Sequence, residues 1–261
     1  MIDLSGAKSK IARANHHIND LERARAAFLA HNPYTLTPEY YVEQNATGYF
    51  LDECPSIPNE ISLLIGDAAH NLRTALDLLA YSLANDHSPR INLSHIYFPI
   101  CENAGGYEAE STRKTKGMSK ASIDAIRAIQ PYGGGNDLLW GLHRLDIIDK
   151  HRLLVTAVVV VDKIGFDVET ERVQNAFRGV FGLAPNAIPK QTIYFGAPAS
   201  IEPPKKGALM FWIAGNHEND RDVQFTFDIT FAEPTVFKGK PIVATLRNIS
   251  HTVNEIVAGF G

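Results

Sequence analysis

The chain has 261 residues, of which 45% are hydrophobic and 21% are charged. This composition is typical of globular proteins, and it excludes collagen-like, disordered and coiled-coil chains. At roughly 150 residues per domain, the length allows one large domain or two small ones. The net charge of −4 argues against a dedicated duplex-DNA-binding protein but leaves room for a small local nucleic-acid site.

Cysteine use and hydropathy indicate the compartment. Cys54 and Cys101 are the two cysteines and form no CxxC pair, so a thiolate zinc site is not expected and a reducing environment is favoured. The first residues lack the apolar segment of a secretory signal. The longest apolar run, 153–161, is too short to span a bilayer. We therefore expect a cytoplasmic protein of bacterial type that makes no membrane contact.

Periodicity predicts the elements of the first half of the chain. Apolar residues at steps of three and four predict a helix that Ser5 caps and that ends at Asn32-Pro33. Residues 38–52 predict a short β-hairpin. A long helix, with Ser56 as its cap, is predicted to run to about residue 84.

The pattern then changes from helical to strand-like. Residues 86–118 are predicted to be mostly irregular, with a short extended piece near 96–100. The cation-rich run 112–120 is interpreted as a solvated loop, with phosphate contact as the alternative. Helices are predicted over 119–129, 137–152 and 241–260, and β-rich segments over 153–161, 192–196, 207–215 and 223–233.

Together these elements predict an α+β fold. Residues 1–153 would form a helical, bundle-like layer that carries the hairpin near 38–52. Residues 154–261 would form an antiparallel sheet followed by the C-terminal helix. We expect the two regions to pack as one compact unit.

The long helix has an apolar face and an opposite polar face. At ~100° per residue, an apolar stripe centred on Leu72 is the expected core face. The opposite face carries a block of ionisable groups between Leu63 and Tyr81. This block is either a satisfied polar seam between helices or the lining of a pocket. Its members are Asp67, His70, Arg73, Thr74 and Asp77.

The helix over 137–152 carries a second set of polar residues. His143, Asp146 and Lys150 form one stripe, and a further stripe holds Trp140, Arg144 and His151. The simplest interpretation of Asp146 and Lys150 is an i,i+4 ion pair worth ~0.3 kcal/mol. Cations at the end of this helix are also favoured by the helix dipole without any function.

Two segments of the chain resemble a known pattern, namely IGDAAHNLRTALDLLAY (65–81) and IQPYGGGNDLLWGLHRLDIIDKHRLL (129–154). They resemble a bacterial family of hypothetical proteins with a helix bearing GD, HNLR and ALD, followed by QPY, GGN, LH and DKHR. The family has no established activity, so the resemblance indicates residues and no reaction. Leu78 stands where the family pattern has a polar residue, often histidine, and a catalytic histidine at that place would be missing here.

Arg144 and His151, with six residues between them, are also similar to the Arg-x(4–6)-His spacing of HEPN domains. In such domains the arginine would hold a phosphate and the histidine would move a proton. The first functional hypothesis is therefore a cleft between the two polar helices that binds or cleaves a nucleotide or single-stranded RNA. No cofactor is expected, and a homo-oligomer is possible. The candidate catalytic residues are His70, Asp77, Asp149 and His151, and the candidate ligand-binding residues are Asn71, Arg73, Arg144 and Lys150.

Two alternatives remain open at this point. Asp67, His70, His143 and Asp146 could hold a divalent metal between the helices, because each helix pairs a carboxylate with an imidazole one turn away. Alternatively, the polar residues form a structural seam in a binding or scaffold protein without catalysis. The sequence therefore does not decide whether the protein is an enzyme.

Overall fold

The expected α+β fold is confirmed by the computed structural model of the chain. The structure describes residues 2–31, 33–53, 55–90, 92–152, 157–167, 182, 192–196, 205–217, 223–233 and 235–261. It describes the backbone alone for residues 151, 152, 166, 167 and 192–196. These residues form helices and two antiparallel sheets. Within this part of the chain, no helix is long and apolar enough to cross a membrane.

The chain divides into two units, each assembled from separate stretches of sequence. Unit 1 comprises Met1–Arg25, Pro58–Thr156 and Glu233–Gly261, and unit 2 comprises Ala26–Ile57 and Ala157–Ala232. The C-terminal helix therefore lies in unit 1 and the early hairpin in unit 2.

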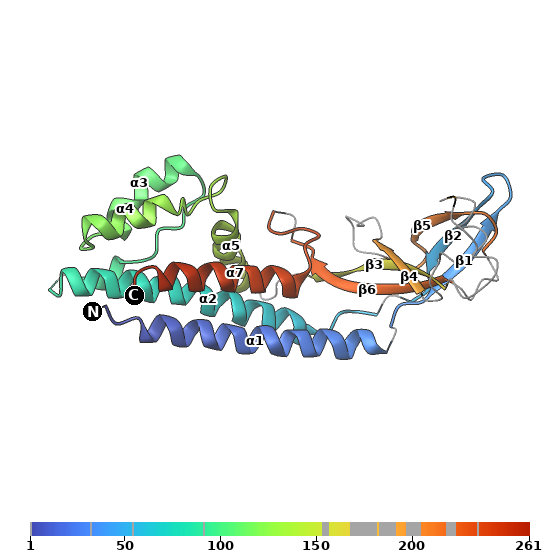
Figure 1. Ribbon diagram of the computed structural model, residues 1–261, viewed down its shortest axis with the longest axis horizontal. Coiled ribbons are helices and arrows are strands. Elements are labelled where there is room, and N and C mark those ends of the chain that lie inside the picture. Colours follow the sequence, from blue (N-terminus) through green and yellow to red (C-terminus); the bar gives the residue numbers. More distant parts are fainter. Residues whose placement is uncertain are drawn as a thin grey trace. The chain divides into compact units, whose positions relative to one another are not determined.

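Unit 1 is helical (Figure 1). Helix α1 begins in this unit, and its last residues belong to unit 2. The elements are α1 (Ser5–Ala30), α2 (Asn59–His87), the short 3-10 helix η1 (Leu93–His95), α3 (Ala104–Lys114), α4 (Lys120–Ala128), α5 (Asp137–Arg152) and α7 (Ile242–Ala258).

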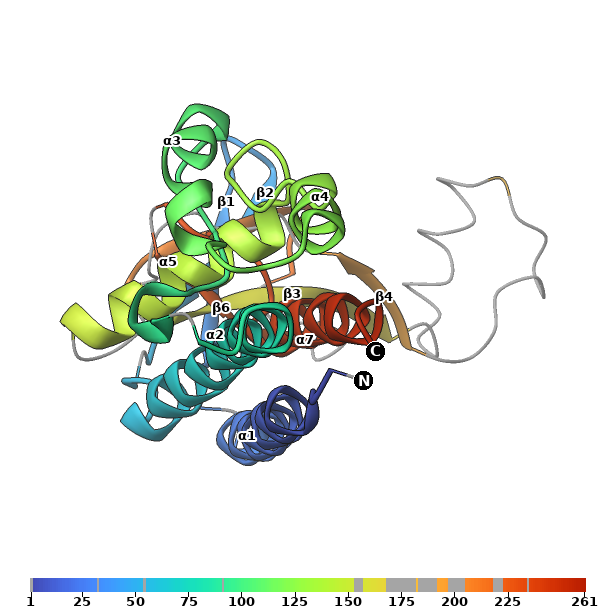
Figure 2. The same ribbon diagram turned by 90° about the vertical axis from the view of Figure 1, so that its left-hand side faces the viewer.

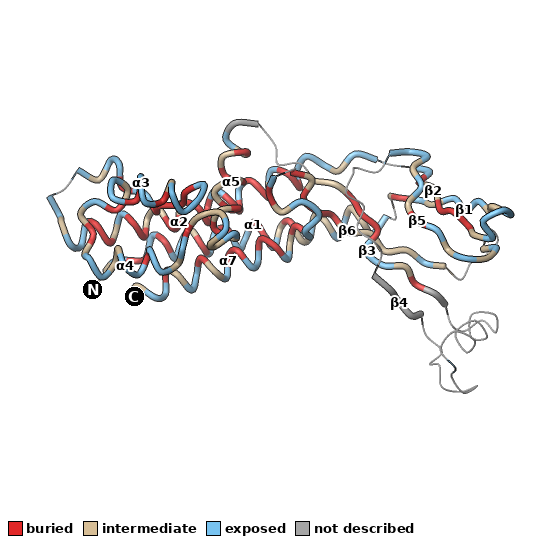
Figure 3. The backbone as a smooth tube through the Cα atoms, turned by 90° about the horizontal axis from the view of Figure 1, so that it is seen from above, coloured by how far each residue is buried: buried red, intermediate tan, exposed pale blue. Residues whose placement is uncertain are grey.

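Helix α2 is the centre of unit 1. It packs against both α5 and α7, and Figure 2 shows α7 beside it with α1 and α5 on different sides. Polar contacts fasten α1 to it, as Ser82 donates to the carbonyl oxygen of Asp3 at 2.7 Å. The predicted core face is correct, and its buried residues recur along the whole helix in Figure 3. These residues are Ile61, Ile65, Ala68, Leu72, Leu76, Leu79 and Leu83.

Unit 2 contains the strands. β1 (Leu36–Tyr41), β2 (Ala46–Leu51) and β5 (Leu209–Ala214) form one antiparallel sheet in the order β1-β2-β5. β4 (Thr192–Gly196), β3 (Ala157–Asp167) and β6 (Val223–Phe231) form a second antiparallel sheet in the order β4-β3-β6. Tyr49, Val161 and Phe211 are buried together in the core of this unit.

Strands form in each segment that was predicted to be β-rich, although β3 extends to Asp167, beyond the predicted 153–161, and residues 153–156 of that prediction lie outside the described residues. Their pairing differs from a single late sheet. The hairpin of β1 and β2 pairs with β5, which lies more than 150 residues later, as the contact of Tyr49 with Phe211 shows. Trp212 of β5 has an exposed fraction of 46%. Strand residues alternate between two faces, so the burial of Phe211 directs its neighbour Trp212 to the opposite face.

Three local predictions were wrong. Residues 104–114 form α3 in a region predicted to be irregular, because the side chain of Asn103 accepts from the backbone N–H of Gly106 and caps the helix despite its glycines. Ser56 does not cap α2, which begins after Pro58 without a side-chain cap. Ser5 is the first residue of α1 and not its cap, and its backbone N–H donates to Oδ1 of Asp3 at 2.9 Å.

Candidate functional site

A histidine and a carboxylate join the two polar helices. Nδ1 of His70 on α2 lies 2.9 Å from Oδ1 of Asp146 on α5. An ionised carboxylate can only accept hydrogen bonds, so Nδ1–H is the donor and Nε2 is the nitrogen that remains for another partner. The side chain of His70 is 47% exposed, whereas that of Asp146 is buried. Lys150 donates to the other oxygen of Asp146 at 2.6 Å, which confirms the expected ion pair.

Asp149 lies one turn further along α5, directly against the backbone of α2. A Cβ built on Gly66 would be 1.9 Å from Oδ1 of Asp149, so only glycine allows this approach. Burial raises the pKa of Asp149, and the nearby carboxylates of Asp67 and Asp146 raise it further. Asp67 itself lies 3.8 Å from Nδ1 of His17 on α1.

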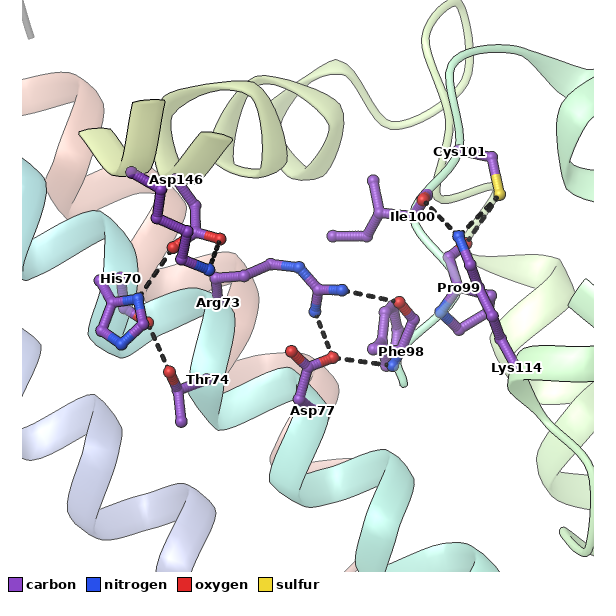
Figure 4. A network of polar contacts seen from close by, with 11 residues as sticks. His70, Arg73, Thr74, Asp77, Phe98, Pro99, Ile100, Cys101, Lys114 and Asp146 are labelled. Carbon is purple, nitrogen blue, oxygen red and sulfur yellow. Dashed lines mark hydrogen bonds and ion pairs between the residues drawn. The ribbon is translucent and has the colours of Figure 1, made fainter. Parts of the chain in front are cut away.

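Arg73 and Asp77 hold a different part of the structure (Figure 4). Nη1 of Arg73 donates to Oδ1 of Asp77 at 2.6 Å, and Nη2 donates to the carbonyl oxygen of Phe98 at 3.0 Å. The backbone N–H of Phe98 donates to the same oxygen of Asp77 at 3.0 Å. Arg73 is only 7% exposed. Both side chains therefore clamp the backbone of one residue, and we call this arrangement the Phe98 clamp.

Lys114 fastens the same segment to α3. Its Nζ donates to the carbonyl oxygen of Ile100 at 3.4 Å and contacts Glu110 at 2.8 Å. It belongs to the cationic run that was expected to be a solvated loop. The structure corrects that expectation in part. Arg113 and Lys114 form the last turn of α3 and only 17% of the Lys114 side chain is exposed, whereas Arg113, Lys116 and Lys120 are exposed as expected.

His143 is surrounded by cations. Burial, together with the charges of Arg73 and Lys114, lowers the pKa of His143 from 6.5 to about 4, so the imidazole is neutral at physiological pH. Its Nδ1 is buried and has no hydrogen-bond partner among the described residues. The described part of the chain also contains no group of three or more histidine, cysteine, aspartate or glutamate side chains arranged to hold a metal ion. Nothing in this geometry therefore favours the alternative of a metal held by Asp67, His70, His143 and Asp146.

Two residues of the other polar stripe of α5, Trp140 and Arg144, contact Glu102. Nε1 of Trp140 donates to Oε2 of Glu102 at 3.3 Å, and Nη1 of Arg144 lies 3.9 Å from the same oxygen. His151, the other member of this stripe, lies outside the residues whose side chains are described, so its proposed pairing with Arg144 stays a prediction.

Asn71 faces α1 instead of α5. It donates to the carbonyl oxygen of Asp67 at 2.8 Å and accepts from Nζ of Lys10 at 3.2 Å. The predicted residues thus fall into separate groups. His70, Asp146, Asp149 and Lys150 lie together where α2 meets α5, and we call them the His70 site.

Sequence reasoning missed Glu102, Lys114 and the backbone of Phe98. The contact to Phe98 could not have been predicted from residue types, because Arg73 and Asp77 bind its backbone carbonyl and N–H groups, which are not specific to phenylalanine. No protein-family model, no curated protein and no solved structure significantly matches the chain.

Proposed function

We propose that the His70 site binds a phosphate-containing ligand, a nucleotide or single-stranded RNA, and that His70 transfers a proton during cleavage of the phosphate ester. The observation that carries this proposal is the hydrogen bond from Nδ1 of His70 to the buried Asp146, in a histidine whose side chain is 47% exposed. A carboxylate that fixes the tautomer and orientation of an imidazole leaves Nε2 as an oriented proton acceptor.

The neighbouring cation supports an anionic ligand. Nζ of Lys150 carries three hydrogen-bond donors and uses one on Asp146, and 48% of its side chain is exposed. A phosphate oxygen beside His70 would therefore find a charged donor. Arg73, the phosphate-binding candidate from the sequence, contributes less to this proposal, because both of its terminal nitrogens are engaged in the Phe98 clamp.

The Phe98 clamp favours a second candidate function, a scaffold in which the polar residues join helices without catalysis. Buried polar groups that satisfy one another fix the orientation of helices, and Arg73 and Asp77 do this for the segment that follows η1. In this case the His70 site would be an extension of the same seam.

Measurement of phosphate-ester cleavage distinguishes the two functions. Wild-type protein and His70→Gln are incubated with a fluorogenic single-stranded RNA and with nucleotides, in EDTA to suppress contaminating nucleases. His251→Gln is the matched control, because His251 also pairs with a carboxylate, Glu255 at 3.3 Å, on an exposed face of α7. We expect His70→Gln to lose at least about 100-fold in rate, the usual contribution of general acid–base catalysis, and His251→Gln to be unchanged.

The proposal fails if the wild-type protein turns over none of these ligands or if His70→Gln is as active as the wild type. Thermal unfolding of each variant shows that a loss of rate is not a loss of fold. No turnover in any of the proteins, together with a lower thermal stability of His70→Gln than of the wild type, would favour the scaffold.

A further inference from the structure

Asp149 has no assigned partner, although it lies close to His70, which Asp146 orients. No hydrogen bond or ion pair joins its carboxylate to another described residue. Its contact with Gly66 places it about one turn along α2 from His70, since four residues span about 6 Å along the helix axis. The carboxylate is therefore within reach of a ligand that also touches His70.

The charges around Asp149 come from both helices. On α2 it faces Asp67 and His70, and on α5 it faces Asp146 and Lys150. From α1, His17 lies 3.8 Å from Asp67, one of the carboxylates that face Asp149. Burial and the like charges of Asp67 and Asp146 disfavour ionisation of Asp149 more than His70 and Lys150 favour it, so Asp149 is the carboxyl group of this site that is best suited to carry a proton.

This inference rests on the proposed function. We propose that Asp149 is the general acid of the His70 site and that the ligand is RNA, whose 2′-hydroxyl is the nucleophile. Such a substrate brings its nucleophile already bonded next to the phosphate, so the protein needs to supply only a base and an acid. A site that holds one oriented imidazole and one protonated carboxyl group meets that requirement.

The proton transfers balance without another reactant. Nε2 of neutral His70 takes the proton of the 2′-hydroxyl while the bond from O2′ to phosphorus forms. The bond from phosphorus to O5′ breaks, and the carboxyl group of Asp149 gives its proton to the leaving O5′. The products are a 2′,3′-cyclic phosphate and a 5′-hydroxyl, with His70 protonated and Asp149 ionised.

Gly66 is the positioning residue in this arrangement. A methyl group at this position would meet the end of the flexible Asp149 side chain at 1.9–3.1 Å and would displace it without removing any functional group. Gly66→Ala should therefore reproduce the catalytic defect of Asp149→Asn. Gly141→Ala is the matched control, because a methyl group on this glycine of α5 meets the ring of Phe237 at 2.2 Å, away from the His70 site.

The test compares two leaving groups. Cleavage of uridylyl-3′,5′-adenosine releases the 5′-oxygen of adenosine, an alkoxide that needs a proton to leave. Cleavage of uridine 3′-(4-nitrophenyl phosphate) releases a nitrophenolate, which leaves without a proton. We expect Asp149→Asn and Gly66→Ala to slow the dinucleotide by about 100-fold or more and the nitrophenyl ester by no more than about threefold. His70→Gln should slow both substrates, and Gly141→Ala should not discriminate between them.

The outcomes separate this inference from the proposed function. Equal slowing of both substrates by Asp149→Asn overturns the role of Asp149 as the acid and leaves the role of His70 intact. No cleavage of either substrate by the wild-type protein overturns both. Because Asp149→Asn preserves the shape of the side chain, it decides the question even if Gly66→Ala does not fold.

Discussion

His70 and His143 differ in the charged groups that surround the imidazole ring. His70 faces a buried carboxylate and stays half-exposed. His143 lies three residues before Asp146 on α5, yet it faces Arg73 and Lys114. Cations repel a further positive charge, and burial adds to the penalty. The same residue type on two packed helices is therefore oriented by a carboxylate and open to solvent in one place, and is buried and held neutral in the other.

The low pKa of His143 predicts how stability depends on pH. The folded protein binds a proton at His143 only below a pH of about 4, whereas the unfolded chain binds it below about 6.5. Stability from this group is present above pH 6.5 and is lost as the pH falls towards 4. The shift corresponds to at most about 3 kcal/mol. Urea unfolding of wild type and His143→Gln between pH 7 and 4 measures it.

In this measurement His143→Gln should lose less stability on acidification than the wild type. The difference between the two proteins isolates His143, since all other titrating groups are common to both. Parallel curves over the whole range would mean that His143 is accessible to protons in the folded state.

At the residue scale, sequence reasoning identified the members of the candidate site better than their partners. The 3.6-residue repeat placed His70, Arg73 and Asp77 opposite the core face of α2, and each of them is engaged in a polar contact. Asp146 was expected as the partner of Lys150, and it was placed opposite His70 both in the cleft hypothesis and in the metal alternative, but no direct contact between Asp146 and His70 was predicted. A register between two helices depends on how their side chains interdigitate, and a single chain does not encode it locally.

Between elements, the Phe98 clamp replaces backbone pairing. It satisfies the N–H and the carbonyl group of Phe98 with side chains of α2, so an irregular segment is held on the helix without a strand. We expect Arg73→Met to destabilise the protein by about 3–5 kcal/mol, because it leaves the half-buried Asp77 without its counterion. The free energy of unfolding in urea measures this loss.

An exposed pair with the same spacing provides the control. Lys120 and Asp124 form an i,i+4 ion pair at 2.9 Å on the surface of α4, and Lys120→Met should have little effect. In the double variant Arg73→Met with Asp77→Leu, the loss should be smaller than the sum of the single losses, because no buried charge is left alone. Additive losses would show that Arg73 and Asp77 do not act as a pair.

The elements themselves followed from the sequence wherever their signals are local. The apolar repeats of α2 and α7 and the alternation of β6 gave correct elements. Helix α3 was missed because Gly105 and Gly106 oppose a helix, whereas the cap from Asn103 and the burial of Tyr107 against the rest of unit 1 outweigh them. Tertiary packing decided that segment, and packing is not visible in a window of sequence.

On the scale of the whole molecule, each unit is built from distant stretches of the chain. The chain passes between the units after Arg25, Ile57, Thr156 and Ala232. These crossings bring the early hairpin next to β5 in unit 2, and they bring α7 back to α2 in unit 1. Such long-range choices were not specified by local propensity, which is why the fold class was predicted and the pairing of the hairpin was not.

The two tryptophans allow the units to be observed separately. The sequence contains only two, and Trp140 lies in unit 1 whereas Trp212 lies in unit 2. Trp212→Phe leaves Trp140 as the fluorescent reporter of unit 1, and Trp140→Phe leaves Trp212 as the reporter of unit 2. Leu72 is completely buried in the core of unit 1, and Leu72→Ala should lower the stability of its surroundings by about 2–5 kcal/mol.

Because each unit buries a core of its own, we expect Leu72→Ala to shift the urea midpoint that Trp140 reports more than the midpoint that Trp212 reports. The reciprocal variant is Phe211→Ala in the core of unit 2, which should shift mainly the midpoint reported by Trp212. Two reporters that always move together would mean that the units unfold as one cooperative structure. In that case the four chain connections between the units would couple their stabilities, although each unit has a core of its own.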